Sequence, residues 1–212
     1  MFLETVLWCE TANIRMFIAT HEETPSKETN MATQRWNIDP SHSGIHFTVR
    51  HMVIAKVRGS FLRWQGTVDF DDANPSASKV QVTVDTASID TREPKRDDHL
   101  RSSDFLDVAT YPALTFSTTA VDRRGEDEYR VRGDLTIHGV TRPVELEVDH
   151  LGRARDPWGN ERIAFQAKTT FNRIDFGLKW NQALETGGLL VGEKVEISLD
   201  VEAVKEQRAA AA

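Results

Sequence analysis

The chain has 212 residues, with 33 acidic and 26 basic side chains and a formal net charge of −7. This acidic balance argues against a protein that binds nucleic acid by charge, so we expect no nucleic-acid partner. Cys9 is the only cysteine, which excludes an intrachain disulfide, and no segment approaches the roughly 18 consecutive apolar residues of a transmembrane helix. The length is typical of a single domain with a sizeable core.

The first 30 residues differ from the rest of the chain. Apolar residues recur near helical spacing and are followed by a polar, proline-containing linker at 21–30; they are Leu3, Leu7, Ile14, Phe17 and Ile18. One interpretation is an amphipathic helix. The other, which we favour, is a gene start placed too far upstream, with Met31 as the true initiator. This segment also lacks the basic start and long apolar run of a secretory signal peptide, so we expect a cytoplasmic protein.

From Trp36 onward, apolar and polar side chains alternate with a period of two, which is typical of half-buried β-strands. In 79–86, for example, Val80, Val82 and Val84 share one face. The same pattern, or a similar strand-like composition, is found at 44–51, 61–70, 113–121, 129–139, 143–150, 162–171 and 194–203.

Turn-forming residues separate these runs, as at 71–76, 123–128 and 156–161. Short connections favour antiparallel neighbours, and the pattern predicts an all-β fold of about eight strands without helices long enough to cover a parallel sheet. A closed or nearly closed antiparallel barrel would bury the apolar faces and remove the edge strands. A two-sheet sandwich is the alternative.

A charged stretch interrupts the strands after residue 93. Pro94 can occupy the first turn of a helix, and we expect a short helix over about 94–102. Leu100 is the one apolar residue among its charges, and Phe105 resumes the apolar pattern. The segment is either a lip at one end of the barrel, with Leu100 and Phe105 pointing inward, or a solvated helix that serves only solubility.

Motifs for catalysis or metal binding are weak. His42 and His46 would lie roughly 13 Å apart on an extended strand, too far to bind one ion, so we expect no metal site. The sequence has no nucleophile elbow, phosphate-binding loop or paired cysteines. Asp97, Asp98 and His99 could serve acid–base chemistry, but neighbours on a helix point in different directions. We therefore expect no catalytic residues and no enzyme.

Five segments together resemble the YceI-like family, which binds polyisoprenoid and other long-chain lipids. They are WNIDPSHSGIHFTVRH (36–51), VRGSF (57–61), SIDTREPKRDDHLRSSDFLDVATYPALTFST (88–118), GDLTIHGVTRPVEL (133–146) and NRIDFGLKWN (172–181). The resemblance runs from Trp36 to about Val204. It divides the chain into an N-terminal extension (1–30), a barrel domain (31–206) and a tail (207–212).

The resemblance implies an extended, lipocalin-like antiparallel β-barrel of eight strands, with the short helix near one end of an apolar pore. The ligand would be a polyisoprenoid, an isoprenoid quinone or a fatty-acid derivative, and no other cofactor is expected. Family members are often dimers and many are exported. A homodimer, transient contact with a membrane and, as the alternative to the cytoplasm, a periplasmic location follow as expectations.

The residues expected to line the pore are apolar and lie on the dry faces of strands: Phe47, Val49, Phe70, Val82, Phe105, Phe116, Leu135, Ile137, Phe165 and Phe171. Phe176 and Trp180, which flank Gly177, are expected to close the opposite side, unless 172–177 is a bulge in the barrel wall. Arg96 and His99 are the expected head-group residues, because a guanidinium matches the geometry of phosphate and histidine can donate beside it.

Overall fold

The computed structural model describes residues 33–52, 54–185 and 188–207. The predictions for residues 1–30 and most of the tail therefore fall outside the described residues. Within the described part of the chain, no helix is long and apolar enough to cross a membrane.

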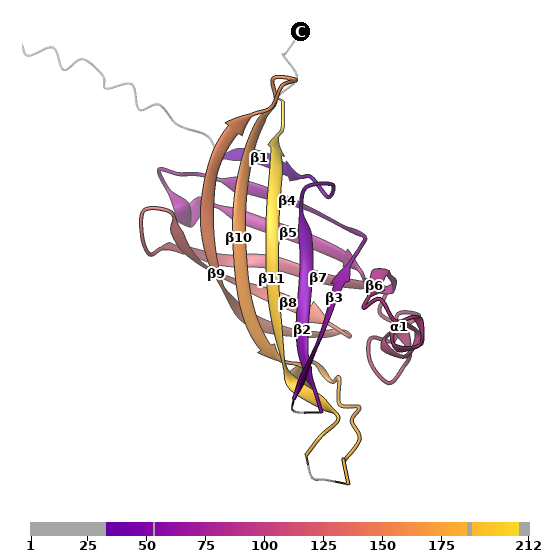
Figure 1. Ribbon diagram of the computed structural model, residues 1–212. Helices are drawn as coiled ribbons and strands as arrows, with labels where there is room; N and C mark the ends of the chain where they lie inside the picture. Colours follow the sequence, from indigo (N-terminus) through magenta and orange to yellow (C-terminus); the bar gives the residue numbers. More distant parts are fainter. Residues whose placement is uncertain (1–32, 53, 186–187, 208–212) are drawn as a thin grey trace, which may run out of the picture. The chain divides into compact units, whose positions relative to one another are not determined.

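The described residues form strands joined by short turns, with one α-helix (Figure 1). The elements in chain order are β1 (Gln34–Ile38), β2 (Gly44–His51), β3 (Ala55–Phe61), β4 (Trp64–Phe70), η1 (Pro75–Ala77), β5 (Lys79–Asp85), η2 (Thr86–Ser88), β6 (Ile89–Asp90), α1 (Pro94–Arg101), β7 (Ala113–Arg123), β8 (Glu128–Ile137), β9 (Val140–Arg155), β10 (Glu161–Asn172), η3 (Arg173–Phe176) and β11 (Val191–Lys205).

The barrel closes through β11. One edge of β11 pairs with β10, and the other pairs with β2 along one half and with β1 along the other. β1 and β2 therefore act as one bent strand. β4 pairs with β1 and β3 pairs with β2, so β4 and β3 act as a second bent strand. Counted this way, eight antiparallel strands form a closed ring. The predicted barrel is confirmed, and the two-sheet sandwich is excluded.

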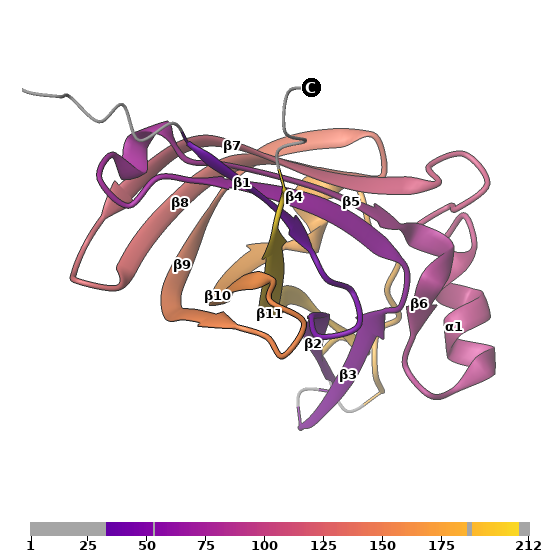
Figure 2. The same cartoon turned by 90° about the horizontal axis from the view of Figure 1, so that it is seen from above.

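The ring has a gap at one end. β4 pairs with β5. Within the described residues, however, β3 has no pairing with β5, and its edge away from β2 pairs only with the two-residue β6. The chain from β6 through α1 lies at this gap, and Figure 2 shows α1 beside β6. We call this end of the barrel the α1 end. The other end, with Trp36, Asp39 and the β9–β10 turn (156–160), is the β1 end.

Apolar side chains inside the barrel form two buried clusters. The cluster toward the β1 end includes Trp36, Ile163 and Ala203, which are almost entirely inaccessible to solvent. The cluster toward the α1 end includes Phe176 and Ile89. The alternation predicted for the strands thus corresponds to one face turned into the barrel and one turned to solvent.

Arg162 joins three segments at the β1 end. Its Nε donates to Asp156 in the β9–β10 turn (2.9 Å), and its Nη1 donates to Asp39 (2.9 Å) and to Glu202 on β11 (2.6 Å). Hydrogen bonds from His42 and Arg162 hold the pKa of Asp39 well below its usual range. Burial alone would raise the pKa of Asp156, but hydrogen bonds from Asn160 and Arg162 outweigh it and lower the pKa to about 2.

We expect Arg162→Gln to lower the free energy of unfolding at neutral pH, because three carboxylates lose their shared cation. A carboxyl group with a depressed folded pKa stabilises the fold above its unfolded pKa, and this contribution is lost as pH falls through the folded value. The ordinary pKa of Asp156 is 3.8 and its folded value is about 2. The deficit of the variant should therefore shrink between about pH 4 and pH 2, as measured by urea unfolding across a pH series.

Arg155→Gln is the matched control, because it removes an exposed ion pair with Glu161 (3.3 Å) beside the same turn. Exposed pairs contribute little to stability, so this variant should unfold much like the wild type at every pH. If the free energy of unfolding of Arg162→Gln stayed below that of the wild type by the same amount from neutral to acid pH, the carboxylates would not be the cause of the lost stability.

Candidate functional site

The barrel encloses a cavity of about 630 Å³. Its wall is almost entirely apolar and is built by the inward-facing residues of the strands, such as Val80, Val82 and Val84 of β5. A volume of this size is typical of pockets that bury most of a small ligand. The alternating pattern of each strand therefore builds an apolar chamber.

Nearly all of the predicted pore residues lie at this cavity. The cavity is lined by Phe47, Val49, Phe70, Val82, Phe105, Phe116, Leu135, Ile137, Phe165, Phe171 and Trp180. Phe176 is absent from the lining. It is buried in the cluster at the α1 end and packs edge-on against Phe171, with ring centroids 5.1 Å apart. Contact between these residues and a lipid stays a prediction.

α1 is fixed at the barrel's gap by buried polar contacts. Asp97 is buried, and its Oδ1 accepts hydrogen bonds from the backbone N–H (2.9 Å) and the hydroxyl (2.5 Å) of Thr91. Arg101 donates from the same helix to the carbonyl oxygens of Ala87 (2.9 Å) and Ile89 (2.7 Å). The helix is thus held at the rim of the cavity, and Leu100 and Phe105 line the cavity, as the lip interpretation predicted.

The two predicted head-group residues lie at the rim, and both have protein partners. Arg96 donates to the hydroxyl (2.7 Å) and the carbonyl oxygen (2.9 Å) of Thr91, which leaves part of its guanidinium fork without a described partner. The Nε2 of His99 lies 3.0 Å from an Asp104 carboxylate oxygen. Both side chains border the cavity.

Trp180 does not close the side opposite α1. Its ring lies against His99, with centroids 4.6 Å apart, and against Phe105, at 5.2 Å. The three rings form one aromatic group at the α1 end. The segment after β10 returns to this end because β10 runs toward it, a long-range consequence of topology that spacing in the sequence does not reveal.

The charged side chains that border the cavity are mostly basic. The basic ones are Arg50, Lys95, Arg96 and Arg173, together with His51 and His99. Among the described residues of the lining, Glu93 is the one acidic residue. This contrasts with the net charge of −7 on the chain. A rim of this composition favours an anionic group at the entrance to the apolar chamber.

Arg173 is a functional-site residue that sequence reasoning missed. Its side chain is buried, with 3% of the residue exposed, and it donates to the backbone carbonyls of Gly192 (2.9 Å), Trp180 (3.0 Å), Val191 (3.2 Å) and Leu178. Burial lowers its pKa, since desolvation disfavours the charged form. The guanidinium holds 178–180 next to the start of β11 at 191–192. No local pattern marks this arginine as buried, although it lies in the motif NRIDFGLKWN.

The segment 172–177 is a 3₁₀ turn, so the bulge alternative is wrong. The Asn172 side chain accepts a hydrogen bond from the N–H of Ile174 (2.9 Å) at the start of η3. Gly177 ends it in the left-handed conformation, with φ of 83°, which a residue without a Cβ adopts readily. This turn redirects the chain from the barrel wall to the rim.

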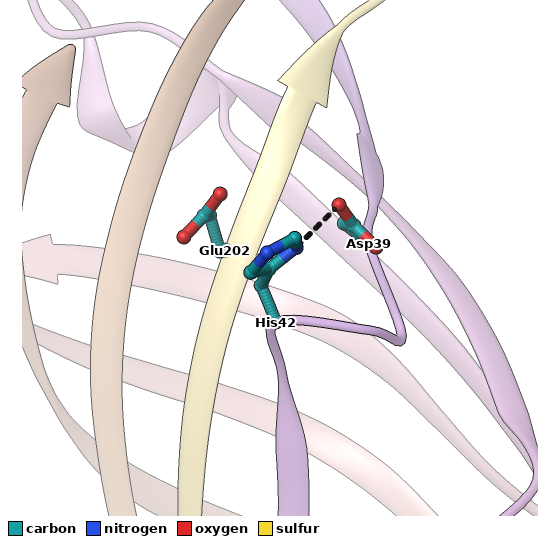
Figure 3. A group of neighbouring side chains, drawn as sticks. All are labelled: Asp39, His42 and Glu202. Carbon is teal, nitrogen blue, oxygen red and sulfur yellow. Dashed lines mark hydrogen bonds and ion pairs between the residues drawn. The ribbon is translucent and has the colours of Figure 1, made fainter. Parts of the chain in front are cut away.

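One group of side chains at the β1 end has the composition of a metal site. Asp39, His42 and Glu202 each place a possible ligand atom within 4.8 Å of the others (Figure 3). The guanidinium of Arg162, however, already donates to both Asp39 and Glu202. The cation between these carboxylates is supplied by the protein itself, and the group is explained by its part in joining β1 to β11.

The acid–base candidates on α1 are separated by the fold. Asp97 is turned inward to Thr91, whereas Asp98 pairs with Arg101 (3.1 Å) on the exposed side. His99 contacts Asp104 instead of Asp97 or Asp98. The three neighbours in sequence therefore form no joint acid–base group.

Known proteins share both the sequence pattern and the barrel. A YceI-like domain model matches residues 36–203. A UPF0312 protein of Pectobacterium carotovorum is 40% identical over 176 residues, which cover 83% of this chain and 88% of that protein. The crystal structure of Burkholderia cenocepacia BcnA matches with a TM-score of 0.70 at 25% identity, over 78% of this chain and 99% of BcnA.

A further solved structure shares the fold at low identity. It is described as a polyisoprenoid binding domain from Saccharophagus degradans implicated in plant cell wall breakdown, and it matches with a TM-score of 0.61 at 18% identity. The match covers 81% of this chain and 98% of that domain. With the family model matching most of the barrel and a relative at 40% identity, the resemblance predicted from the motifs is confirmed. The chain belongs to the YceI-like family.

Proposed function

We propose that this protein binds and carries a long-chain amphiphilic lipid, with the apolar chain in the barrel cavity and the head group at the α1 end. The observation that carries the proposal is the cavity itself, an apolar chamber of about 630 Å³ bordered by basic side chains. Candidate ligands are a polyisoprenoid, an isoprenoid quinone or a fatty-acid derivative. The polyisoprenoid-binding description of the Saccharophagus degradans domain, which has the same fold, supports this assignment.

The energetics of such a ligand suit a carrier. Burial of a chain of roughly 40 carbons, at about 0.8 kcal/mol per methylene, would nominally contribute about 30 kcal/mol relative to water. This exceeds the practical limit of roughly 18–21 kcal/mol for noncovalent binding, and ordering of the flexible chain offsets much of it. In a bilayer, however, the chain is already out of water. Exchange between bilayer and barrel therefore has a small net free energy in either direction.

The rim favours an anionic head group. Arg96 and His99 are the proposed contacts, and Lys95 and Arg50 add further positive charge at the border of the cavity. Charge-assisted hydrogen bonds to phosphate or carboxylate are stronger than bonds between neutral groups. We propose binding without chemical conversion, since Asp97, Asp98 and His99 each have separate structural partners.

Mass spectrometry of the purified protein, native and after organic extraction, tests the proposal most directly. We expect a long-chain lipid in near-stoichiometric amount, because an apolar chamber of this size retains an amphiphile through purification in water. A protein that is empty and also refuses added polyprenyl, quinone and fatty-acid ligands would refute lipid carriage and favour a barrel with a purely structural role.

We expect Val82→Trp to block uptake of a fluorescent polyprenyl probe, because the indole would occupy the cavity that Val82 lines. Uptake should fall at least tenfold, while the melting temperature changes little if the cavity offers space for the ring. Fluorescence titration and thermal unfolding measure the two effects. In a solidly packed core the same change would cost about 1–3 kcal/mol of stability.

Gln81→Trp is the matched control, since Gln81 is the preceding residue on β5 and is exposed on the outer face. It should bind the probe like the wild type. Probe uptake that survives Val82→Trp and an equivalent Leu135→Trp change would contradict the assignment of the cavity as the binding chamber.

We expect Lys95→Gln and Arg96→Gln to weaken binding of a polyprenyl phosphate more than binding of the uncharged polyprenol of equal chain length. The loss for the phosphate should be about tenfold for each variant, since a hydrogen bond to a charged group contributes about 1.5–3 kcal/mol. Paired titrations with the two ligands isolate the head-group contribution.

Lys168→Gln, on the exposed face of β10, is the control and should change neither affinity. Equal losses for both ligands would indicate damage to the rim instead of lost head-group recognition.

A further inference from the structure

An exposed apolar group lies at the α1 end beside the cavity. Ile54 is 86% exposed at the turn between β2 and β3, with Met52 (44%) and, across from it, Leu189 (43%). The backbone N–H of Met52 donates to the carbonyl oxygen of Leu190 (2.8 Å), which ties the turn to the segment before β11. We call Met52, Ile54 and Leu189 the apolar tip.

The apolar tip is continuous with the cavity wall. His51 precedes Met52 and lines the cavity, and so do Leu190 and Val191, which follow Leu189. His51 and Val191 are also paired in the register between β2 and β11. A lipid leaving the chamber along this wall would reach the apolar tip before it reached open water.

A pair of basic residues lies directly behind the apolar tip. Arg50 on β2 and Lys56 on β3 are opposite each other in the hairpin register. Like charges in this position repel one another. Lys56 pairs with Glu196 (3.1 Å), whereas the structure gives the Arg50 side chain no hydrogen bond or ion pair with any residue that it describes. An anion supplied from outside would relieve the repulsion.

We propose that the apolar tip inserts into the interface of an anionic lipid bilayer, with Arg50 and Lys56 at the level of the phosphates. Apolar side chains that enter the acyl boundary, followed by basic side chains that reach the head groups, are the usual composition of an interfacial anchor. This proposal rests on lipid carriage as the function. It adds the face that meets the membrane and places the cavity entrance against the bilayer surface.

Two exposed apolar residues far from the apolar tip supply a matched control. Trp158 is 81% exposed in the β9–β10 turn, and Leu151 is exposed on β9; neither lines the cavity. They lie toward the β1 end, at the opposite ends of strands β9 and β10 from the rim. Their removal takes away similar apolar surface without touching the entrance.

The test uses the full chain and vesicles of phosphatidylcholine with or without phosphatidylglycerol. Met52→Ser/Ile54→Ser should reduce co-flotation with the anionic vesicles by roughly tenfold or more, equivalent to at least about 1.4 kcal/mol. Transfer of a fluorescent polyprenyl phosphate between vesicles should slow to a similar extent. Uptake of the same probe from cyclodextrin, which needs no bilayer, should remain at the wild-type level. Leu151→Ser/Trp158→Ser should behave like the wild type in all three measurements.

The outcomes separate this proposal from the proposed function. Flotation that depends on the apolar tip in a protein that takes up no probe would support bilayer docking and refute lipid carriage. Normal probe uptake with equal flotation of both double variants would overturn docking at the apolar tip and leave carriage intact. A tip variant that changes from dimer to monomer in size-exclusion chromatography, with flotation unaltered, would overturn the proposal in favour of an interface between two copies of the chain.

Discussion

One edge of β11 pairs with two different strands, β2 and β1, and this shared pairing shapes the whole barrel. β11 is long enough to pair with β2 and with β1 in succession, so the two strands after them, β3 and β4, are separated in the same way. β4 continues around the barrel to β5, whereas β3 turns away and leaves a gap. A closed ring at the β1 end and a gapped ring at the α1 end follow from this single feature. The cavity can therefore have an entrance without an unpaired edge running along the entire barrel.

The gap also explains why polar side chains are buried at the α1 end. A helix that covers a gap in a sheet cannot use strand pairing, so its attachment depends on side chains such as Asp97 and Arg101, which satisfy backbone groups of 87–91. Arg173 has the same role for the segment before β11. Buried polar groups with complete hydrogen bonding give these irregular segments a defined position, which apolar contacts alone specify less well.

The sequence predicted the parts of the structure that depend on local periodicity. Alternation with a period of two identified the strands and their inner faces, and Pro94 marked the start of α1, so the barrel and the wall residues such as Val82 and Phe165 could be anticipated. The rim was harder to predict. The position of Trp180 beside His99 and the burial of Arg173 depend on where β10 ends in the folded barrel and on the direction that the chain takes through η3. No local sequence pattern contains that information. Phe176 is apolar, as a pore residue would be, but it lies in a 3₁₀ turn outside the alternating strands and is buried in the cluster at the α1 end without lining the cavity.

The attachment of α1 has a consequence for how such barrels can diversify. Between β6 and β7, the chain from Thr91 to Pro112 takes part in no strand pairing within the described structure. Insertions or deletions here would alter the size and charge of the entrance without shifting the register of any strand. The barrel wall and its entrance are thus separable: a change in the entrance segment need not disturb the strand register of the wall. The same apolar chamber could then be combined with entrances of different size and charge.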